Sequence, residues 1–188
     1  AKAFIAAGFP WVLTFEVLDD SHGQNLLRDR VRRLIETGIR IGAFAVVSGG
    51  PICASFSIAK TPAIRLREHP EGVPWAPPDD QEKLRVGNRH AAWIAKLIRL
   101  CVRFDVRYLF ENPQSSWLWK QPVLLRIYRS TKVKWLLTDH CAWGAPWRKR
   151  TLLFPISMPS IIVPYVALAV TVILSFAARQ EVPGLRSS

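Results

Sequence analysis

The segment from Gly42 to Gly50, GAFAVVSGG, constrains the fold more than any other stretch of the chain. It is a continuous run of small and β-branched apolar residues that ends in glycines, without the alternation of a half-exposed strand. Such a run predicts a strand over 42–48 that is buried on both faces, as in a parallel sheet covered by helices. With 188 residues, the chain is long enough for one domain with a sizeable core.

Strand and helix patterns alternate around this segment. Their β-branched and aromatic content predicts further strands at 11–17, 106–111, 133–139 and 150–156. Apolar spacing predicts helices at 1–8, 25–38 and 79–104, with Gly38 expected to end the second. Another helix is predicted to begin at a Ser115 or Ser116 cap and to kink at Pro122. Residues 58–80 carry many prolines and predict a long loop.

This alternation predicts an α/β fold with a mostly parallel sheet and helices on both faces. Ligands of such sheets bind beyond the carboxyl ends of the strands. Glu16, Cys53 and Glu111 each stand at or just after the end of a predicted strand. We therefore expect these three residues to lie along one edge of the sheet.

The net charge and the cysteine pattern restrict the partners and the cellular compartment that the sequence favours. The formal net charge of +12 favours a polyanionic partner such as nucleic acid or an acidic membrane surface. Three scattered cysteines do not make a disulfide framework, and without a CxxC pair they do not predict a metal site, even though His140 adjoins Cys141. Cys101 lies among leucines on a predicted helix and is expected in the core. A reduced compartment, nuclear or cytoplasmic, is expected, and the first residues lack a signal-peptide pattern.

Three short motifs follow predicted strands in order: GGPICASFS at 49–57, FENP at 110–113 and CAWGAPWRKRTLLF at 141–154. Together they resemble the cytosine-5 DNA methyltransferases, whose Pro-Cys loop, Glu-Asn-Val element and Gln-x-Arg-x-Arg element occur in this order. The sequences of these motifs are most similar to those of methyltransferase-like domains of eukaryotic mobile elements. The resemblance covers about residues 1–154 and implies a Rossmann-like methyltransferase fold, incomplete at the N-terminus.

The resemblance implies a role for each matching residue. Cys53 matches the nucleophile that adds to C6 of a flipped-out cytosine, and Glu111 matches the acid that contacts the ring at N3. Arg148 and Arg150 match the arginine pair that supports the loop and the base. Three further matches concern S-adenosylmethionine and the loops around it: Glu16, which would bind the ribose, Pro51, the first proline of the catalytic loop, and Asn112, its partner after the glutamate.

The chemistry explains why these residue types are needed. Addition of a thiolate at C6 turns C5 into a nucleophilic carbon, and covalent catalysis of this kind divides one difficult step into easier ones. Nearby cations favour the thiolate by lowering a cysteine pKa. Flipping the base out of its stack costs a few kcal/mol. Contacts between basic side chains and the DNA backbone can offset this cost. The chain offers such side chains at Arg126, Arg129, Lys132, Lys134, Arg148, Lys149 and Arg150.

Several positions depart from the family pattern. The glycine-rich loop for the methionine part of the cofactor should precede residue 1, so we expect a fragment with an incomplete cofactor site. Substitutions are seen at Ile52, Ala54, Pro113 and Trp147, and the arginine pair aligns only after a shift of one residue. Asp19, Asp20 and Asn25 compete for the contact with the adenine.

Residues 155–188 form a separate apolar tail. Residues 151–178 carry no charge, and 161–178 are numerous enough to span a bilayer, with Arg148, Lys149 and Arg150 then marking its cytoplasmic side. Three interpretations compete: a membrane anchor, a buried sheet segment, or unrelated sequence fused to a decayed gene. The family resemblance ends at about residue 154, which favours unrelated fused sequence. A buried sheet segment fits only to about residue 156.

Three functions remain at this stage. The first is S-adenosylmethionine-dependent cytosine-5 methylation of DNA, by an enzyme or by an inactive relative. The second is a non-catalytic basic domain that binds nucleic acid, with or without a membrane tether. The third is an amino-methyltransferase that uses NPQS at 112–115, but it leaves Cys53 without a role.

Overall fold

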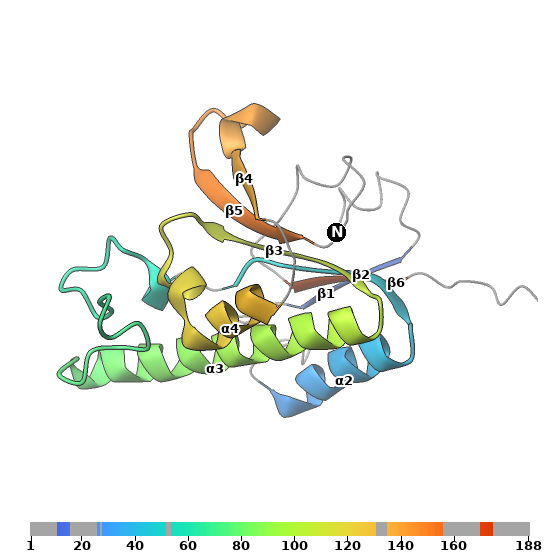
Figure 1. The fold of residues 1–188 in the computed structure, drawn as a ribbon, viewed down its shortest axis with the longest axis horizontal. Coiled ribbons are helices and arrows are strands. Elements are labelled where there is room, and N and C mark those ends of the chain that lie inside the picture. The colour runs from blue at the N-terminus through green and yellow to red at the C-terminus, as the bar shows by residue number, and fades with distance from the viewer. Residues whose placement is uncertain are drawn as a thin grey trace, which may run out of the picture.

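The computed structural model describes residues 11–15, 26, 28–51, 54–130, 135–155 and 170–174. Figure 1 shows the fold. The strands are β1 (Trp11–Phe15), β2 (Phe44–Gly49), β3 (Arg107–Pro113), β4 (Leu136–Asp139), β5 (Arg150–Pro155) and β6 (Val170–Leu174). The helices are α2 (Asp29–Arg40), α3 (Pro78–Arg103) and α4 (Pro122–Ser130), with 3₁₀ turns η1 (Ala54–Phe56), η2 (Trp117–Lys120) and η3 (His140–Trp143). The fold is α/β, as the alternation of patterns predicts.

The described strands form one sheet in the order β1-β6-β2-β3-β5-β4. Within it, β2 and β3 pair in parallel, whereas the pairs β1–β6, β6–β2, β3–β5 and β5–β4 are antiparallel. The sheet is therefore mixed, and the expectation of a mostly parallel sheet is wrong. The pairings imply that β1, β2, β3 and β4 all point in one direction. Strand β6 lies between β1 and β2, and β5 lies between β3 and β4. Because both run in the opposite direction, the sheet is mixed.

The described helices cover one face of the sheet, where Figure 1 draws α2, α3 and α4 together. This follows from the strand order, because β1, β2, β3 and β4 advance across the sheet in a single direction. Right-handed crossovers that advance in one direction place all their helices on the same face. Helices on both faces would require the order to reverse, so for the described residues that expectation is wrong.

The predicted strands and the long helix are confirmed in position, but α2 differs at its end. The helix continues through Gly38 to Arg40 instead of ending at the glycine. A Cβ atom on Gly38 would lie 2.2 Å from Cζ of Phe44, the first residue of β2. Gly38 therefore allows α2 to approach the ring of Phe44 closely, and it is not a helix terminator.

The segment after β3 also differs from its prediction. Ser116 caps the 3₁₀ turn η2, because its hydroxyl accepts a hydrogen bond from the backbone N–H of Leu118 at 3.2 Å. Helix α4 then begins at Pro122. Proline is well suited to the first position of a helix, where its missing N–H has no intrahelical partner. Pro122 thus starts a second helix and does not kink one continuous helix.

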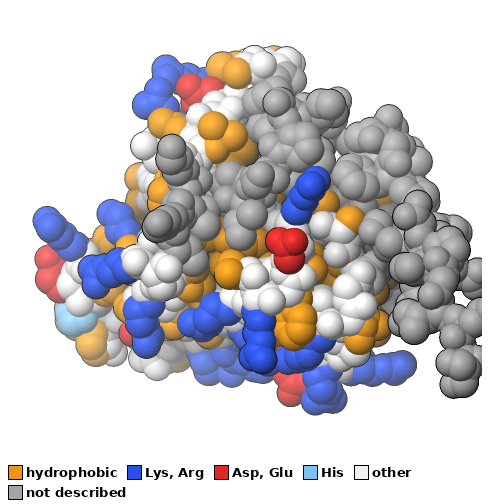
Figure 2. Space-filling model, turned by 45° about the vertical axis from the view of Figure 1, so that its right-hand side comes forward, with side chains coloured by type: hydrophobic (Ala, Val, Ile, Leu, Met, Phe, Trp, Pro, Cys, Tyr) orange, Lys and Arg blue, Asp and Glu red, His pale blue; other side chains and the backbone are white. Residues whose placement is uncertain are grey.

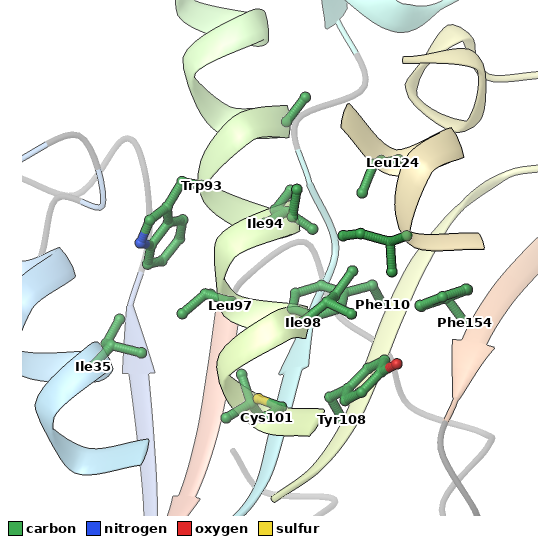
Figure 3. Close-up of a cluster of buried hydrophobic side chains, with 14 of the residues drawn as sticks. Ile35, Trp93, Ile94, Leu97, Ile98, Cys101, Tyr108, Phe110, Leu124 and Phe154 are labelled. Atoms are coloured by element: carbon green, nitrogen blue, oxygen red, sulfur yellow. The ribbon is translucent and has the colours of Figure 1, made fainter. Parts of the chain in front are cut away.

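The main core lies between α3 and the sheet, where apolar side chains from both meet (Figure 3). Leu97 and Ile98 of α3 and Tyr108 and Phe110 of β3 are almost fully buried. Cys101 belongs to this cluster, and burial raises the pKa of its thiol to about 12. The prediction that Cys101 is a core residue is confirmed, and its burial and raised pKa both disfavour reaction of the thiol.

Strand β6 lies within the segment 161–178 that is long enough to span a bilayer. Its residues VTVIL are mostly β-branched, and they pair with both β1 and β2. The expectation that sheet structure ends near residue 156 is wrong for these residues, and the remainder of the tail, 156–169 and 175–188, lies outside the described residues. In the described part of the chain, no helix combines the length and the apolar composition that a membrane crossing requires.

Candidate active site

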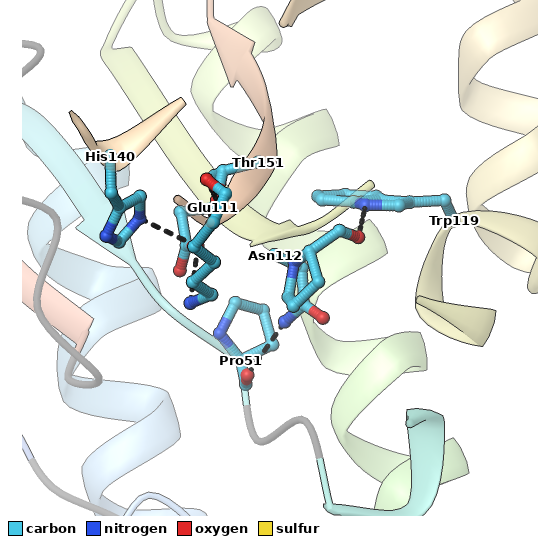
Figure 4. A network of polar contacts seen from close by, with 8 residues as sticks. Pro51, Glu111, Asn112, Trp119, His140 and Thr151 are labelled. Atoms are coloured by element: carbon cyan, nitrogen blue, oxygen red, sulfur yellow. Dashed lines mark hydrogen bonds and ion pairs between the residues drawn. The ribbon is translucent and has the colours of Figure 1, made fainter. Parts of the chain in front are cut away.

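The parallel pairing of β2 and β3 brings the ends of two predicted motifs together. Pro51 follows β2, and Asn112 is the penultimate residue of β3. Nδ2 of Asn112 donates a hydrogen bond of 2.9 Å to the carbonyl oxygen of Pro51, and both residues are buried. Figure 4 shows this bond at the base of the loop that leads towards Cys53. Asn112 therefore ties the beginning of the Pro-Cys loop to β3.

Glu111 precedes Asn112 on the strand, so the two side chains leave opposite faces of the sheet. The carboxylate of Glu111 is buried, and three polar groups converge on its Oε1 atom. Nζ of Lys149 lies at 3.2 Å, the hydroxyl of Thr151 donates at 3.4 Å, and Nε2 of His140 lies at 4.0 Å. Figure 4 shows His140 and Thr151 directed towards Glu111. A buried carboxylate with a cation beside it is held in one orientation.

Three consecutive basic residues at the beginning of β5 approach different acids. Arg150, the first residue of β5, is paired with Asp139 of β4, whereas Arg148 and Lys149 directly precede the strand. Lys149 contacts Glu111, whereas its neighbours Arg148 and Arg150 both approach Asp139, with Nε–Oδ distances of 3.3 Å and 3.6 Å. Both arginine side chains are about half exposed or more, so these ion pairs contribute little to stability. The structure thus brings Lys149, and not the predicted arginine pair, to the candidate acid.

Two predicted site residues, Cys53 and Glu16, lie outside the described residues. The prediction that the Cys53 sulfur and the Glu111 carboxylate share one cleft therefore stays a prediction. The structure does describe the residues on either side of Cys53, namely Pro51 and the turn η1, which begins at Ala54.

A complete site for S-adenosylmethionine needs an acid for the ribose and a glycine-rich turn that lets the backbone approach the ligand. The residues that follow β1, EVLDD, include Glu16 but hold no glycine. Gly49 ends β2, and Gly50 follows it in the direction of Cys53. Strand β6 takes the position between β1 and β2. Among the described residues, these strand ends do not supply both features, so the incomplete cofactor site stays a prediction.

Sequence reasoning missed several residues of this region. Lys149 and Thr151 were not assigned to Glu111 from the sequence. Thr151 lies on β5, which pairs with β3, and Lys149 directly precedes β5. His140 was considered only as a metal ligand. Among the described residues, no group of three His, Cys, Asp or Glu side chains could hold a metal ion. Arg65, in the loop between η1 and α3, is also fully buried, and nothing in the local sequence pattern indicates this.

A second polar region is a groove of about 470 Å³ between α2 and α3. Its lining includes the basic residues Arg32, Arg33, Arg89 and Lys96 and the acids Asp29 and Glu36. Lys96 pairs with Glu36 at 2.7 Å, which leaves an excess of arginine charge in the groove. Burial, and then the neighbouring Arg89, lower the pKa of Arg32. The groove is thus an electropositive surface on the helical layer.

Comparisons with models of protein families, with curated proteins and with solved structures found no match to this chain.

Proposed function

We propose that the chain is a cytosine-5 DNA methyltransferase-like domain that has kept the nucleophilic half of the reaction. The observation that carries the proposal is the buried Glu111, paired with Lys149, next to the residue that ties the Pro-Cys loop to β3. Three motifs in family order support it further. The Rossmann-like ancestry of the mixed sheet is part of the same proposal.

The proposed step is the addition of Cys53 to a cytosine that has left the duplex stack. The thiolate sulfur forms a bond to C6, and the π electrons of the C5–C6 bond move to C5. Without a bound methyl donor, C5 takes a proton from water, so the addition is balanced and reversible. Glu111 contacts the ring at N3 as the acid, with its carboxyl proton directed to the N3 lone pair. Lys149, 3.2 Å from Oε1, positions this carboxyl group. In the family, S-adenosylmethionine supplies a methyl group to C5 in place of this proton.

We expect this chain to bind S-adenosylmethionine less well than members of the proposed family do. Glu16 is the residue proposed for the ribose, but the turn for the methionine end is not among the residues present. We expect calorimetry to detect weak binding of S-adenosylmethionine or none. Micromolar affinity would contradict the incomplete site, and a matched Glu16→Gln variant would then show whether this acid contributes.

The test of the proposed function is a covalent trap that needs no methyl donor. Duplex DNA of mixed sequence with 5-azacytosine in place of cytosine accepts a thiolate at C6, and the ring N5 then takes a proton from water. We expect a denaturant-resistant protein–DNA adduct, measured by gel shift and mass spectrometry. Cys53→Ala should abolish it, and Cys141→Ser should leave it intact. An adduct that survives Cys53→Ala, or no adduct at all, would contradict the proposal.

A second candidate function, nucleic-acid binding without catalysis, is favoured by the groove between α2 and α3. On the face drawn in Figure 2, Lys and Arg side chains line the lower border, with isolated acidic side chains among them. Such a surface binds phosphates with a strong dependence on salt. We expect fluorescence anisotropy with mixed-sequence duplex DNA to show weaker binding for Arg33→Gln combined with Arg89→Gln, and unchanged binding for Cys53→Ala. If DNA binds in this way and no adduct forms, the second function is the better one.

A further inference from the structure

Arg65 is a charged residue inside the protein. Its side chain is 1% exposed, although it stands in a loop without regular secondary structure. The guanidinium has five N–H donors, and it makes four hydrogen bonds. Nε donates to the carbonyl oxygen of Ser55 at 2.8 Å and Nη2 to its hydroxyl at 3.2 Å. Nη1 donates to the carbonyl oxygen of Pro70 at 2.7 Å and to Oδ1 of Asn88 at 2.9 Å.

Two of these four bonds fix one residue, Ser55, which stands two positions after Cys53. The guanidinium also lies over the ring of Phe56, with 4.3 Å between Cζ and the ring centroid. Ser55 and Phe56 are buried and form most of the turn η1. Arg65 therefore contacts the backbone, a hydroxyl and an aromatic ring of the turn that continues from the cysteine.

The other side of the guanidinium is anchored to rigid elements. Asn88 belongs to α3, and its Nδ2 donates to the carbonyl oxygen of Glu71 at 2.7 Å. Nε2 of Gln121, just before α4, donates to the carbonyl oxygen of Pro70 at 2.6 Å. The loop at 70–71 is thus held on two helices, and Arg65 connects it to η1.

Gly87 of α3 makes this approach possible. A Cβ atom there would lie 2.3 Å from the hydroxyl oxygen of Ser55 and 3.1 Å from Nη2 of Arg65. Any larger residue at this position would displace the hydroxyl of Ser55. The backbone of α3, the guanidinium and η1 therefore pack as one unit.

The acceptors around Arg65 are neutral, which makes the burial costly. Burial lowers the pKa of Arg65 to about 10, partly opposed by the nearby Glu71, and the group keeps its charge at neutral pH. An apolar side chain would fill the space without this desolvation cost. The planar fork of an arginine can reach acceptors on both sides at once, which a lysine cannot. The advantage of Arg65 is therefore geometric.

We propose that Arg65 is a positioning residue that fixes the turn after Cys53 and thereby orients the nucleophile. The inference rests on the proposed function, since it takes Cys53 as the group that attacks the base. A nucleophile misplaced by about 1 Å loses on the order of a hundredfold in rate. Arg65 is expected to act on the rate of attack and not on the presence of the thiol.

The experiment compares Arg65→Lys with Arg67→Lys in the full chain carrying Cys141→Ser. Arg67 is an exposed arginine of the same loop, so the two variants make the same chemical change. The first readout is the rate of adduct formation with the 5-azacytosine duplex. We expect Arg65→Lys to lower this rate at least about tenfold, and Arg67→Lys to leave it unchanged. Ser55→Ala, which removes only the bond to Nη2, should give a smaller loss.

The second readout separates positioning from folding. Iodoacetamide, a small reagent that needs no docked base, should alkylate Cys53 in Arg65→Lys within about threefold of the unaltered rate. Cys101 is buried, and its raised pKa protects it, so its alkylation reports opening of the core. We expect Cys101 to stay unmodified in Arg65→Lys, as mass spectrometry would show. Rapid modification of Cys101 would mean that Arg65 serves stability only, and this would overturn the inference.

The outcomes distinguish this inference from the function on which it rests. If the unaltered protein forms no adduct, the proposed function fails and the inference fails with it. If the unaltered protein forms the adduct and Arg65→Lys does so at the rate of Arg67→Lys, the inference alone is overturned. Gly87→Ala, whose methyl group would displace the hydroxyl of Ser55 from its place beside Arg65, gives an independent check and should also slow adduct formation.

Discussion

Asn112 and Pro51 are joined by a hydrogen bond of 2.9 Å although 61 positions separate them in the sequence. The bond links the end of β3 to the first residue beyond β2 and its glycines, and it is made between buried groups. It is a direct contact between the second motif of the chain and the first. Its strength should decide how well the Pro-Cys loop is held.

The first prediction concerns this bond. Asn112→Ala leaves the carbonyl oxygen of Pro51 buried without its donor, and an unsatisfied buried acceptor costs about 1–3 kcal/mol. We expect the free energy of unfolding in urea to fall by this amount, and the covalent adduct with 5-azacytosine DNA to form more slowly. Gln114→Ala, at an exposed position just beyond the same strand, is the control. Equal stability of the two variants would contradict the role of Asn112.

The second prediction concerns Lys149 and Glu111. Lys149→Met removes the nearest cation and leaves the buried carboxylate with two weaker contacts, from Thr151 and His140. Because the lysine is partly exposed, the expected loss of unfolding free energy is modest, about 1 kcal/mol. Lys149→Arg should restore most of it. Arg148→Met removes an equal charge that pairs with Asp139 instead, so chemical denaturation should show almost no change. A larger loss for Arg148→Met would mean that the wrong cation has been assigned to Glu111.

The order of strands and helices along the chain could be predicted from local patterns, because β2 is a continuous apolar run and α3 has apolar residues at helical spacing. The pairing of β6 could not. VTVIL is typical of a strand, but nothing in those residues determines that the strand pairs between β1 and β2 and in the antiparallel direction. Long-range partners depend on which edges of the sheet the rest of the chain leaves open. The mixed sheet is thus a property of the tertiary structure.

The candidate site was predictable to the same extent. Glu111, Asn112 and Pro51 could be located because each belongs to a motif at a strand end. The choice among Arg148, Lys149 and Arg150 depends on the conformation of the residues that lead into β5, because Arg148 and Lys149 precede the strand. Arg65 had no local signal, because an arginine in a proline-rich loop has no periodic context. Only the packing of that loop against α3 reveals its burial.

The third prediction concerns Gly38. Replacing glycine by alanine inside a helix ordinarily stabilises it by about 0.5–1 kcal/mol. Here the new methyl group would overlap the ring of Phe44, so we expect a net loss of about 1–3 kcal/mol from overpacking. A double-mutant cycle with Phe44→Leu measures the contact. Gly38→Ala should be neutral or stabilising in the Phe44→Leu background. The same loss in both backgrounds would show that the ring does not cause it.

The last prediction concerns the stability of the fold in acid. His90 of α3 is 3% exposed, and among the described residues its Nε2 atom has no hydrogen-bond partner. Burial, followed by the charges of Arg32 and Arg89, lowers its pKa to about 4. The folded protein therefore keeps this imidazole neutral at pH values where the unfolded chain, with a pKa near 6.5, already binds a proton.

Because the unfolded state binds more protons between about pH 6.5 and pH 4, acidification through this window favours unfolding. The stability that His90 contributes is fully present above pH 7. It is lost progressively below 6.5, to a total on the order of 3 kcal/mol at pH 4. Urea unfolding of the unaltered protein and of His90→Gln, measured from pH 7.5 to pH 4.5, tests this. The unaltered protein should lose stability more steeply than the variant, and parallel pH profiles would show that His90 does not account for the loss.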